Sequence, residues 1–397
     1  MTTTIAFIVG IMLSPRSLTL SGNLVGHLGT GFLGWMLFAL FGHFLTVIMY
    51  RALSVPSPRG RTEVAVLVNA FGKIPALSLT LGSRILFTMT VSVSLLAIAG
   101  YVFNEVFVYW FPNLGFSFLL LGCLFLLCCL GTEVARKVQV FFVATTLLGL
   151  VVLVLSGIVT GGGRLPESSS NPLPGRELLF AGSASFLLLV GFDLSGFLHH
   201  PREKALGPFS PAMVWGLVIV GVVFFCWGWV SMRCVPLDQL SETTVPAMVT
   251  ARAILGQPGR VVMGIILLAA SASSVNGLLI GTSNLVSETA HQDLLPPVFK
   301  RSFGQVNLSC VLLVLGVASL LYLGMAGKPV LEVFIRTGLC LWLLYYAALH
   351  LALLLARNGS PGRQSGRPSG MALVVPILGF VIFLMAFFLQ VVYVYLI

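Results

Sequence analysis

The stretch VGFDLSG, from Val190 to Gly196, interrupts a long apolar run with two glycines and a carboxylate. A second stretch, VGIMLSP from Val9 to Pro15, interrupts the first apolar run of the chain in the same way. Both follow the pattern Val-Gly-x-x-Leu-Ser and then carry a residue that disfavours helix. Hydrocarbon cannot satisfy the N–H and C=O groups of an unwound backbone, so such breaks must face protein, a cavity or a ligand.

The composition indicates an integral membrane protein. Of 397 residues, 57% are hydrophobic and only 9% are Asp, Glu, Lys or Arg, against about 25% charged residues in soluble domains. The formal charge of +10 is spread in short basic groups between the apolar runs. Because no basic stripe or aromatic-interleaved patch is present, we expect a lipid bilayer around the chain and no nucleic-acid partner.

The apolar runs predict an all-α polytopic bundle of about eleven transmembrane helices. The predicted spans are residues 4–27, 32–53, 75–105, 114–131, 136–160, 178–198, 210–232, 259–288, 309–326, 330–356 and 372–396.

The basic residues predict the orientation of the chain. With a cytoplasmic N-terminus, thirteen lysines and arginines fall in cytoplasmic loops and six in external loops, while Arg16, Arg84 and Arg336 fall inside spans, which accounts for all 22. This excess of cytoplasmic positive charge favours a cell-membrane protein with its N-terminus inside and its C-terminus outside.

Two polar connections divide the chain. The loop GGGRLPESSSNPLPGRE, residues 161–177, is predicted to be external and separates a first five-span repeat, residues 1–160, from a second, residues 178–356. The linker RNGSPGRQSGRPSG, residues 357–370, is predicted to be cytoplasmic and precedes an additional span in residues 371–397. The two similar motifs, at residues 9–15 and 190–196, then lie in the first span of each set of five. This placement is typical of five-plus-five inverted-repeat transporters with broken spans 1 and 6; kinked packing helices without a ligand are the alternative.

Patterns for catalysis and metal binding are absent from the sequence. The histidines lack HExxH spacing, the seven cysteines lack CxxC spacing, and there is no Ser/His/Asp grouping or phosphate-binding loop. We therefore expect no enzyme, no metal site and no bound cofactor, and a proton or sodium gradient remains open as the energy source.

Four motifs resemble those of the amino acid–polyamine–organocation (APC) superfamily of permeases. IVGIMLSP stands where the family carries Gly-Ser-Gly-Ile-Phe-x-x-Pro, and GFD matches the Gly-Phe-Glu of the sixth span. GTEVARKVQVFFVATTLLGL resembles the entry to the fifth span, and SNLVSETAHQDLLP keeps the length and the Leu-Leu-Pro end of the run after the eighth. These stretches are residues 8–15, 191–193, 131–150 and 283–296.

The resemblance runs across residues of about 5–356 and implies a permease that moves amino acids or related organic amines by alternating access. The chain departs from the family pattern at Ile8 and Val9, which replace small residues, at HHPREKALGP (residues 199–208), and in lacking a twelfth span. These departures leave open a transporter-like sensor that binds a ligand without cycling.

The resemblance also implies a substrate site at the two helix breaks. The substrate carboxylate would meet main-chain amides around Val9 and Gly10, and its ammonium would meet carbonyls near Ala6, Leu187 and Val190. Since the surrounding side chains are apolar, a neutral amino acid is expected rather than a cationic one. The implied binding residues are Ala6, Ile8, Val9, Gly10, Met12, Phe186, Leu187, Val190, Gly191 and Phe192.

Asp193 is the principal candidate for coupling, because an ionisable residue within a span is usually paired and functional. Its candidate partners are Arg84 and Arg336, either of which could instead reach to the membrane interface. Three roles remain open for Asp193: a structural ion pair, a carrier of the coupling proton, or a direct substrate contact.

Span 8 supplies further coupling candidates in Ser273, Ser274 and Asn276. A sodium site in this architecture combines span 1 carbonyls with span 8 hydroxyls, whereas some proton-coupled relatives place a span 5 lysine there. The resemblance puts Thr146 at that position, so this chain has no lysine there. The alternative for these polar residues is interhelical hydrogen bonding.

Overall fold

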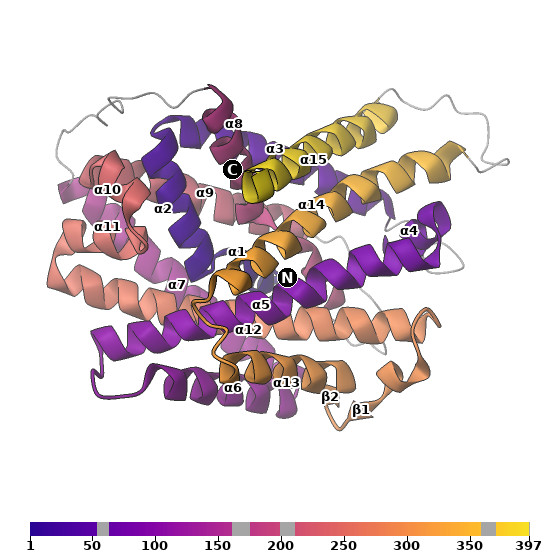
Figure 1. The fold of residues 1–397 in the computed structure, drawn as a ribbon, viewed down its shortest axis with the longest axis horizontal. Coiled ribbons are helices and arrows are strands. Elements are labelled where there is room, and N and C mark those ends of the chain that lie inside the picture. Colours follow the sequence, from indigo (N-terminus) through magenta and orange to yellow (C-terminus); the bar gives the residue numbers. More distant parts are fainter. Residues whose placement is uncertain (54–62, 161–174, 199–210, 359–370, 397) are drawn as a thin grey trace.

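The computed structural model describes residues 1–53, 63–160, 175–198, 211–358 and 371–396. Most of the polar linker predicted at 357–370, most of the loop predicted at 161–177, and all of HHPREKALGP lie outside these described residues. Figure 1 shows a bundle of long helices that pack side by side.

Among the described residues up to 198, eight α-helices are followed by two short 3-10 helices. Their bounds are α1 (Thr2–Met12), α2 (Pro15–Leu28), α3 (Gly31–Leu53), α4 (Glu63–Phe71), α5 (Lys73–Val106), α6 (Asn113–Cys129), α7 (Thr132–Thr160), α8 (Gly175–Ser183), η1 (Ala184–Leu189) and η2 (Phe192–Phe197).

The remaining helices complete the bundle, and a two-stranded antiparallel hairpin connects two of them. Their bounds are α9 (Pro211–Cys234), α10 (Leu237–Glu242), α11 (Pro246–Leu255), α12 (Gln257–His291), η3 (Pro297–Lys300), β1 (Ser302–Phe303), β2 (Val306–Asn307), α13 (Leu308–Tyr322), α14 (Pro329–Asn358) and α15 (Met371–Leu396).

The predicted membrane spans are present as helices. In the described residues, eight helices are long and apolar enough to cross a bilayer, and the bent pair α1–α2 makes a ninth. The spans predicted at 114–131 and 309–326 correspond to α6 and α13, which are apolar but shorter, at 17 and 15 residues. Apart from the short hairpin, the described residues form an all-α bundle in which the first span is broken between α1 and α2.

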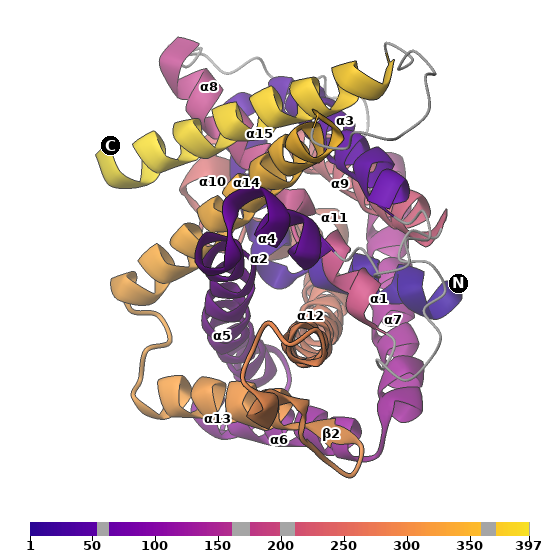
Figure 2. The same ribbon diagram turned by 90° about the vertical axis from the view of Figure 1, so that its right-hand side faces the viewer.

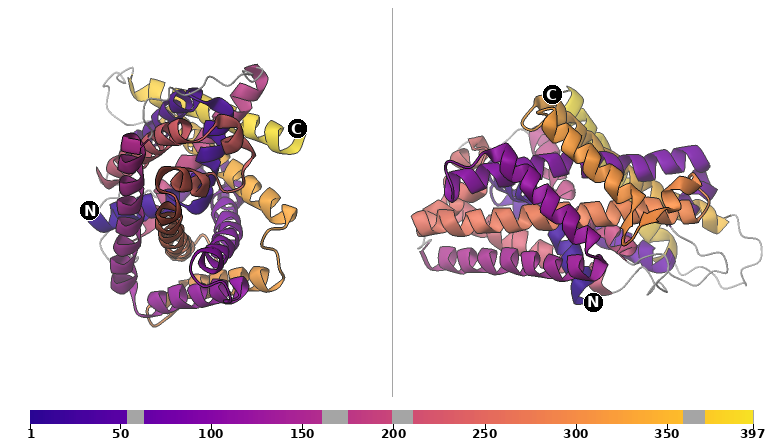
Figure 3. Two further views of the ribbon diagram at one scale, coloured as in Figure 1. Left: turned by 90° about the vertical axis from the view of Figure 1, so that its left-hand side faces the viewer. Right: turned by 90° about the horizontal axis from the view of Figure 1, so that it is seen from below.

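Helix α12 lies at the centre of the bundle, with α5 and α7 on opposite sides (Figure 2). Figure 3 shows the same central position from the other side of the molecule. Small residues such as Ser271, Ala272 and Gly277 occupy its middle, and small side chains allow neighbouring helices to approach closely. The centre of the protein is therefore built around α12, and α1 packs against it.

The outer helices expose apolar side chains, as a protein surrounded by lipid requires. On α7, Phe141, Leu148 and Leu155 recur every seven residues and are more than half exposed. Since seven residues make about two helical turns, these side chains form one stripe on one face. The stripe faces away from the core.

Candidate functional site

The first helix break lies between α1 and α2, whose axes differ by 56°. Leu13 leaves the helical conformation, and Pro15 begins α2 because it has no N–H to place in the first turn. The Ser14 side chain accepts a hydrogen bond from the Ser17 N–H at 3.1 Å and so caps α2. The break therefore leaves the last carbonyls of α1 and the first N–H groups of α2 outside the helical ladder.

The second break lies where the sequence predicts it, between η1 and η2. Val190 is extended, and Gly191 has φ of +107°, which an L-residue rarely adopts. A Cβ on Gly191 would lie 2.6 Å from Ile11 Cγ2. The two broken spans are thus in direct contact at Ile11 and Gly191, and glycine is required there for both conformation and space.

The two motifs share residues, but the helices break at different positions within them. Helix α1 continues through Gly10 to Met12, and Leu13 N–H donates to the Val9 carbonyl at 2.8 Å. The main-chain amides of Val9 and Gly10 therefore lie inside a regular helix, three to four residues before the break. Pro15 decides this position, because a helix can run up to the residues before a proline but not through it.

A polar cluster joins α1, α7 and α12. Gln139 Nε2 donates to Ser273 Oγ at 3.0 Å and to the Ala6 carbonyl at 3.5 Å, while Asn276 Nδ2 donates to Gln139 Oε1 at 2.8 Å. Ser274 Oγ donates to the Gly10 carbonyl at 2.6 Å. The predicted coupling residues of span 8 therefore do meet α1, and Gln139 of α7 completes the cluster.

Thr146 lies about two turns further along α7, beside a narrow pocket that has no room for a water molecule. Its hydroxyl donates to the Phe142 carbonyl of its own helix at 3.0 Å, whereas Gln139 bonds both α1 and α12. The lining of the pocket combines predicted binding and coupling residues with two apolar neighbours: Val9, Gly10, Leu13, Val143, Thr146 and Ser273. A Cβ on Gly10 would lie 2.1 Å from Ser273 Oγ, so Gly10 permits the close approach of α1 and α12.

The other predicted binding residues face different neighbours. Ile8 packs against Gly216 of α9. Phe186 lies in an aromatic cluster with Phe38 of α3 and Phe383 of α15, at ring centroid distances of 5.5 and 5.9 Å. Met12, Val190 and Phe192 are buried beside the breaks, and Leu187 is partly buried.

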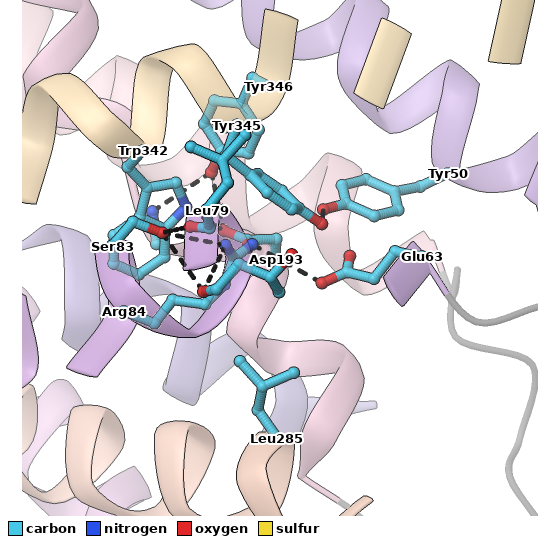
Figure 4. A network of polar contacts seen from close by, with 12 residues as sticks. Tyr50, Glu63, Leu79, Ser83, Arg84, Asp193, Leu285, Trp342, Tyr345 and Tyr346 are labelled. Atoms are coloured by element: carbon cyan, nitrogen blue, oxygen red, sulfur yellow. Dashed lines mark hydrogen bonds and ion pairs between the residues drawn. The ribbon is translucent and has the colours of Figure 1, made fainter. Parts of the chain in front are cut away.

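Asp193 is the centre of a buried charged network (Figure 4). One carboxylate oxygen accepts from Arg84 Nη2 of α5, and both side chains are 0% exposed. The other oxygen accepts from the Tyr346 hydroxyl at 2.7 Å and from Trp342 Nε1 at 3.2 Å, both on α14. These bonds tie the second half of the broken span 6 to α5 and α14. Of the two arginines predicted as partners of Asp193, Arg84 is the one that binds it.

Arg336, the other predicted partner, bonds Glu332 instead. Its Nε donates to Glu332 Oε1 at 3.3 Å, and its side chain is 44% exposed. Arg16 of α2 also bonds Glu332, with both oxygens at 2.7 Å from Nη2, and donates to Ser94 of α5 through Nη1 at 2.9 Å. An ion pair therefore holds each broken span against α14 or α5: Arg16–Glu332 on α2 and Arg84–Asp193 on η2.

A second carboxylate, Glu63, reaches the same arginine. Its Oε1 lies 3.6 Å from Arg84 Nη2, and its side chain is 6% exposed. Glu63 is the first residue of α4, outside the membrane spans, and Gly72 (φ +86°) lets α4 fold back along α5. Burial raises the pKa of Glu63 to about 7, against the opposing effect of Arg84.

Aromatic rings enclose this network. The Arg84 guanidinium carbon lies 3.7 Å from the ring centroid of Tyr345 and 4.9 Å from that of Trp342, a cation–π arrangement. The Tyr345 hydroxyl lies 3.5 Å from the Tyr50 hydroxyl of α3. Arg84 is thus held by carboxylates at one end and covered by rings on its faces.

Comparison with known proteins agrees with this architecture. The profile of the amino acid permease family matches residues 1–395. The chain belongs to the amino acid permease family. A protein of Methanocaldococcus jannaschii described as uncharacterized is 25% identical over 179 residues, which are 43% of this chain and 40% of that protein.

A solved transporter shares the fold of this permease. Mhp1, a nucleobase-cation-symport-1 family transporter in a closed conformation with bromovinylhydantoin bound, matches with a TM-score of 0.61 and 14% sequence identity. The match covers 99% of this chain and 90% of Mhp1. The permease is therefore an integral membrane transporter by family, and the match to Mhp1 shows its all-α inverted-repeat fold with broken spans 1 and 6.

The sequence did not predict Glu63 and Gln139, nor the aromatic residues Tyr50, Trp342, Tyr345 and Tyr346 around Asp193 and Arg84. Glu63 lies in a predicted loop, and Gln139 lies in a span with few polar residues. A signal for Gln139 is present, since a glutamine within an apolar span needs a hydrogen-bond partner. No local signal marks Glu63, because its partner arginine is 21 positions away on another helix.

Proposed function

We propose that this permease is a secondary active transporter of neutral amino acids or related small organic amines that works by alternating access. The observation that carries this proposal is the contact of two broken helices at Ile11 and Gly191. Paired breaks in spans 1 and 6 are the recurring substrate site of inverted-repeat transporters. The chain is placed in that group by its family and fold.

The chemistry of the breaks suits a zwitterion. Helix α2 directs the N–H groups of its first turn toward the break, and these can receive a carboxylate. The carbonyls at the end of α1 and around Val190 can accept bonds from an ammonium group. In this assignment the carboxylate binds at the start of α2, near Ser14, rather than at the amides of Val9 and Gly10.

The side chains around the breaks favour a neutral substrate. Met12, Val190 and Phe192 are apolar and almost fully buried. The charged groups nearest to them, Asp193 and Arg84, already bond each other. A cationic side chain would need a carboxylate that is not engaged, because burying an unpaired charge is costly.

The two ion pairs act as gates in this proposal. Arg16–Glu332 joins α2 to α14, and Arg84–Asp193 joins η2 to α5. Rocking of spans 1 and 6 against α5 and α14 must break one pair at a time if the site is to open to one side only. In the structure both pairs are formed, which corresponds to a closed state.

The cluster around Gln139 favours a proton gradient over sodium. A sodium ion between α1 and α12 would need the oxygens of Ala6 and Ser273 as ligands. The amide group of Gln139 already donates to both oxygens, and an amide nitrogen cannot act as a ligand in addition. We therefore propose that no sodium ion is bound at this position.

Thermal stabilisation followed by flux measurement tests the proposed function. Purified protein is screened against the twenty amino acids, simple amines and a hydantoin, the last because Mhp1 carries a hydantoin ligand. We expect a neutral amino acid to raise the melting temperature and to exchange in proteoliposomes. Stabilisation without exchange would show a sensor, and stabilisation by the hydantoin alone would overturn the proposed substrate class.

We further propose a cell-membrane location with the N-terminus in the cytoplasm. The support is the excess of lysine and arginine in the predicted cytoplasmic loops. In a background without reactive native cysteines, a cysteine at Ser365 should be protected from an impermeant thiol reagent applied to intact cells. Labelling of this cysteine at the rate of an external control would contradict the proposed orientation.

A further inference from the structure

We infer that Glu63 is the proton-binding residue of this transporter and that its protonation controls the Arg84–Asp193 ion pair. This inference rests on the proposed transport function and adds to it the group that senses the proton. The site is the buried meeting point of α4, α5, η2 and α14, around the guanidinium of Arg84 (Figure 4).

The charges at this site do not balance when every group is ionised. Arg84 carries one positive charge, and Glu63 and Asp193 would together carry two negative charges within bonding reach of it. All three side chains are almost fully buried, with 0%, 6% and 0% exposure for Arg84, Glu63 and Asp193. Because an unbalanced buried charge is costly, one of the two carboxyls is expected to hold a proton.

The hydrogen bonds identify which carboxyl this is. Asp193 accepts bonds from Arg84, Tyr346 and Trp342, all of which stabilise its ionised form. Glu63 Oε1 has only the longer approach to Arg84 and no hydrogen-bond partner among the described residues, and the other donors to its carboxyl are the neutral hydroxyls of Tyr50 and Tyr345. Because a charge-assisted hydrogen bond from a guanidinium stabilises a carboxylate more than a bond from a neutral hydroxyl does, the proton belongs on Glu63.

The groups that face Glu63 come from four elements. They are Arg84 of α5, Asp193 of η2, Tyr50 of α3 and Tyr345 of α14. Desolvation and the negative charge of Asp193 both favour the protonated carboxyl, while Arg84 and the two hydroxyls oppose it. The outcome is a pKa for Glu63 of about 7, which allows the group to exchange its proton under physiological conditions.

Loss of the proton changes the pairing of Arg84. When the O–H bond of Glu63 breaks and the proton passes to water at the α4 end of the bundle, two ionised carboxylates compete for one guanidinium. Arg84 then divides between them, and its bond to Asp193 weakens. Because that bond ties η2 to α5, proton release favours movement of the broken span, and proton uptake restores the closed arrangement.

Infrared difference spectroscopy tests proton binding without any knowledge of the substrate. Purified protein in lipid is titrated from acid to alkaline pH, and the C=O band of protonated carboxylic acids is followed. We expect a band that disappears with a midpoint near pH 7 and is absent from Glu63→Gln. Glu63→Asp should retain a titrating band at a shifted midpoint. Persistence of the wild-type band in Glu63→Gln would overturn the inference.

Flux in proteoliposomes tests the coupling, with radiolabelled L-alanine and L-leucine as probes alongside any amino acid that stabilises the protein. Glu63→Gln should retain exchange at equal pH on both sides but lose accumulation driven by a pH gradient, to the level seen without a gradient. Glu133→Gln is the matched control, because that carboxylate is 75% exposed and lies outside the network. It should accumulate like the wild type.

The failures can be told apart. Absence of exchange of every probe by the wild type would overturn the proposed function, while the infrared titration would still decide whether Glu63 binds the proton. Accumulation by Glu63→Gln at the wild-type level would overturn the coupling role and leave the transport function standing. Loss of exchange and accumulation together, in a folded Glu63→Gln protein, would show a structural role and also overturn the inference.

Discussion

Replacing both buried carboxylates around Arg84 is expected to destabilise the protein far more than the two single replacements together. Asp193 and Glu63 both lie within ion-pair distance of the same guanidinium, which is itself fully buried. Each carboxylate can therefore serve as the counter-charge when the other is removed. The substitutions Asp193→Asn and Glu63→Gln keep the side-chain shapes and delete only the charges.

Each single replacement should have a modest effect near pH 6. Glu63→Gln removes a carboxyl that is mostly protonated there, since its pKa is about 7, so the expected cost is below about 1 kcal/mol. In Asp193→Asn the amide oxygen can still accept from Tyr346 and Trp342, and Glu63 ionises to pair with Arg84. The expected cost is about 1–2 kcal/mol, the difference between a charge-assisted and a neutral hydrogen bond.

The double variant leaves Arg84 without any counter-charge. Removing the only partner of a buried ion typically costs about 3–5 kcal/mol. Because the single variants account for about 1–3 kcal/mol of this, a coupling energy of about 2 kcal/mol should appear between Glu63 and Asp193. Cation–π contact with Tyr345 and Trp342 offsets only part of the loss.

The assay measures the free energy of unfolding at pH 6 by reversible denaturation with SDS in mixed detergent micelles. It is applied to the wild type, both single variants and the double variant. A parallel cycle that pairs Asp193→Asn with Glu133→Gln is the control, because Glu133 is largely exposed and bonds Arg136. That cycle should be additive. If the Glu63 and Asp193 changes were also additive, the two carboxylates would not share Arg84, and the charge argument would be refuted.

Three further predictions concern the breaks, the cation and pH. Gly191→Ala should destabilise the protein by about 1–3 kcal/mol and lower its melting temperature, because Gly191 has φ of +107° and a Cβ there would clash with Ile11. Gly196→Ala is the control and should not lower it, because a Cβ at Gly196 would meet nothing within 4 Å. Equal effects of the two changes would contradict the assignment of the break. Replacing sodium by choline should leave uptake unchanged, because Gln139 already donates to Ala6 and Ser273; sodium-dependent uptake would contradict this. Burial raises the pKa of Glu63 from 4.5 to about 7, so the folded state binds this proton more tightly than the unfolded chain. The resulting stability, about 3 kcal/mol, is full below the unfolded pKa and is lost as pH rises through about 7; melting curves should show this loss in the wild type and not in Glu63→Gln.

The membrane class, the helices and the family were predictable from the sequence because each depends on residues that are close together in the chain. Apolar runs of about 20 residues specify spans wherever they occur. Gly191 breaks span 6 because only glycine adopts its backbone conformation easily, and Pro15 breaks span 1 because it cannot donate to the helix. For span 1 the sequence offered both Gly10 and Pro15, and α1 ends at Met12, with Leu13 as its C-cap, shortly before Pro15 opens α2.

The site depended on contacts between distant parts of the chain. Arg84 was predicted as one of two partners of Asp193, and only the packing of α5 against η2 chose it over Arg336. Thr146 was predicted as the coupling candidate of α7 and lies beside Gly10 and Ser273, while Gln139, about two turns earlier on α7, makes the hydrogen bonds to α1 and α12.

What the sequence determined by itself is the set of helices and the places where they break, because hydrophobic periodicity and backbone conformation act within a few residues. What only the tertiary structure decided is which charges meet. Glu63 reaches Arg84 because α4 folds back along α5 at Gly72, and Asp193 reaches it from 109 positions away. Charges interact through space over a few ångströms, so a carboxylate in a loop and one in a broken helix come to share one arginine only after the bundle has packed.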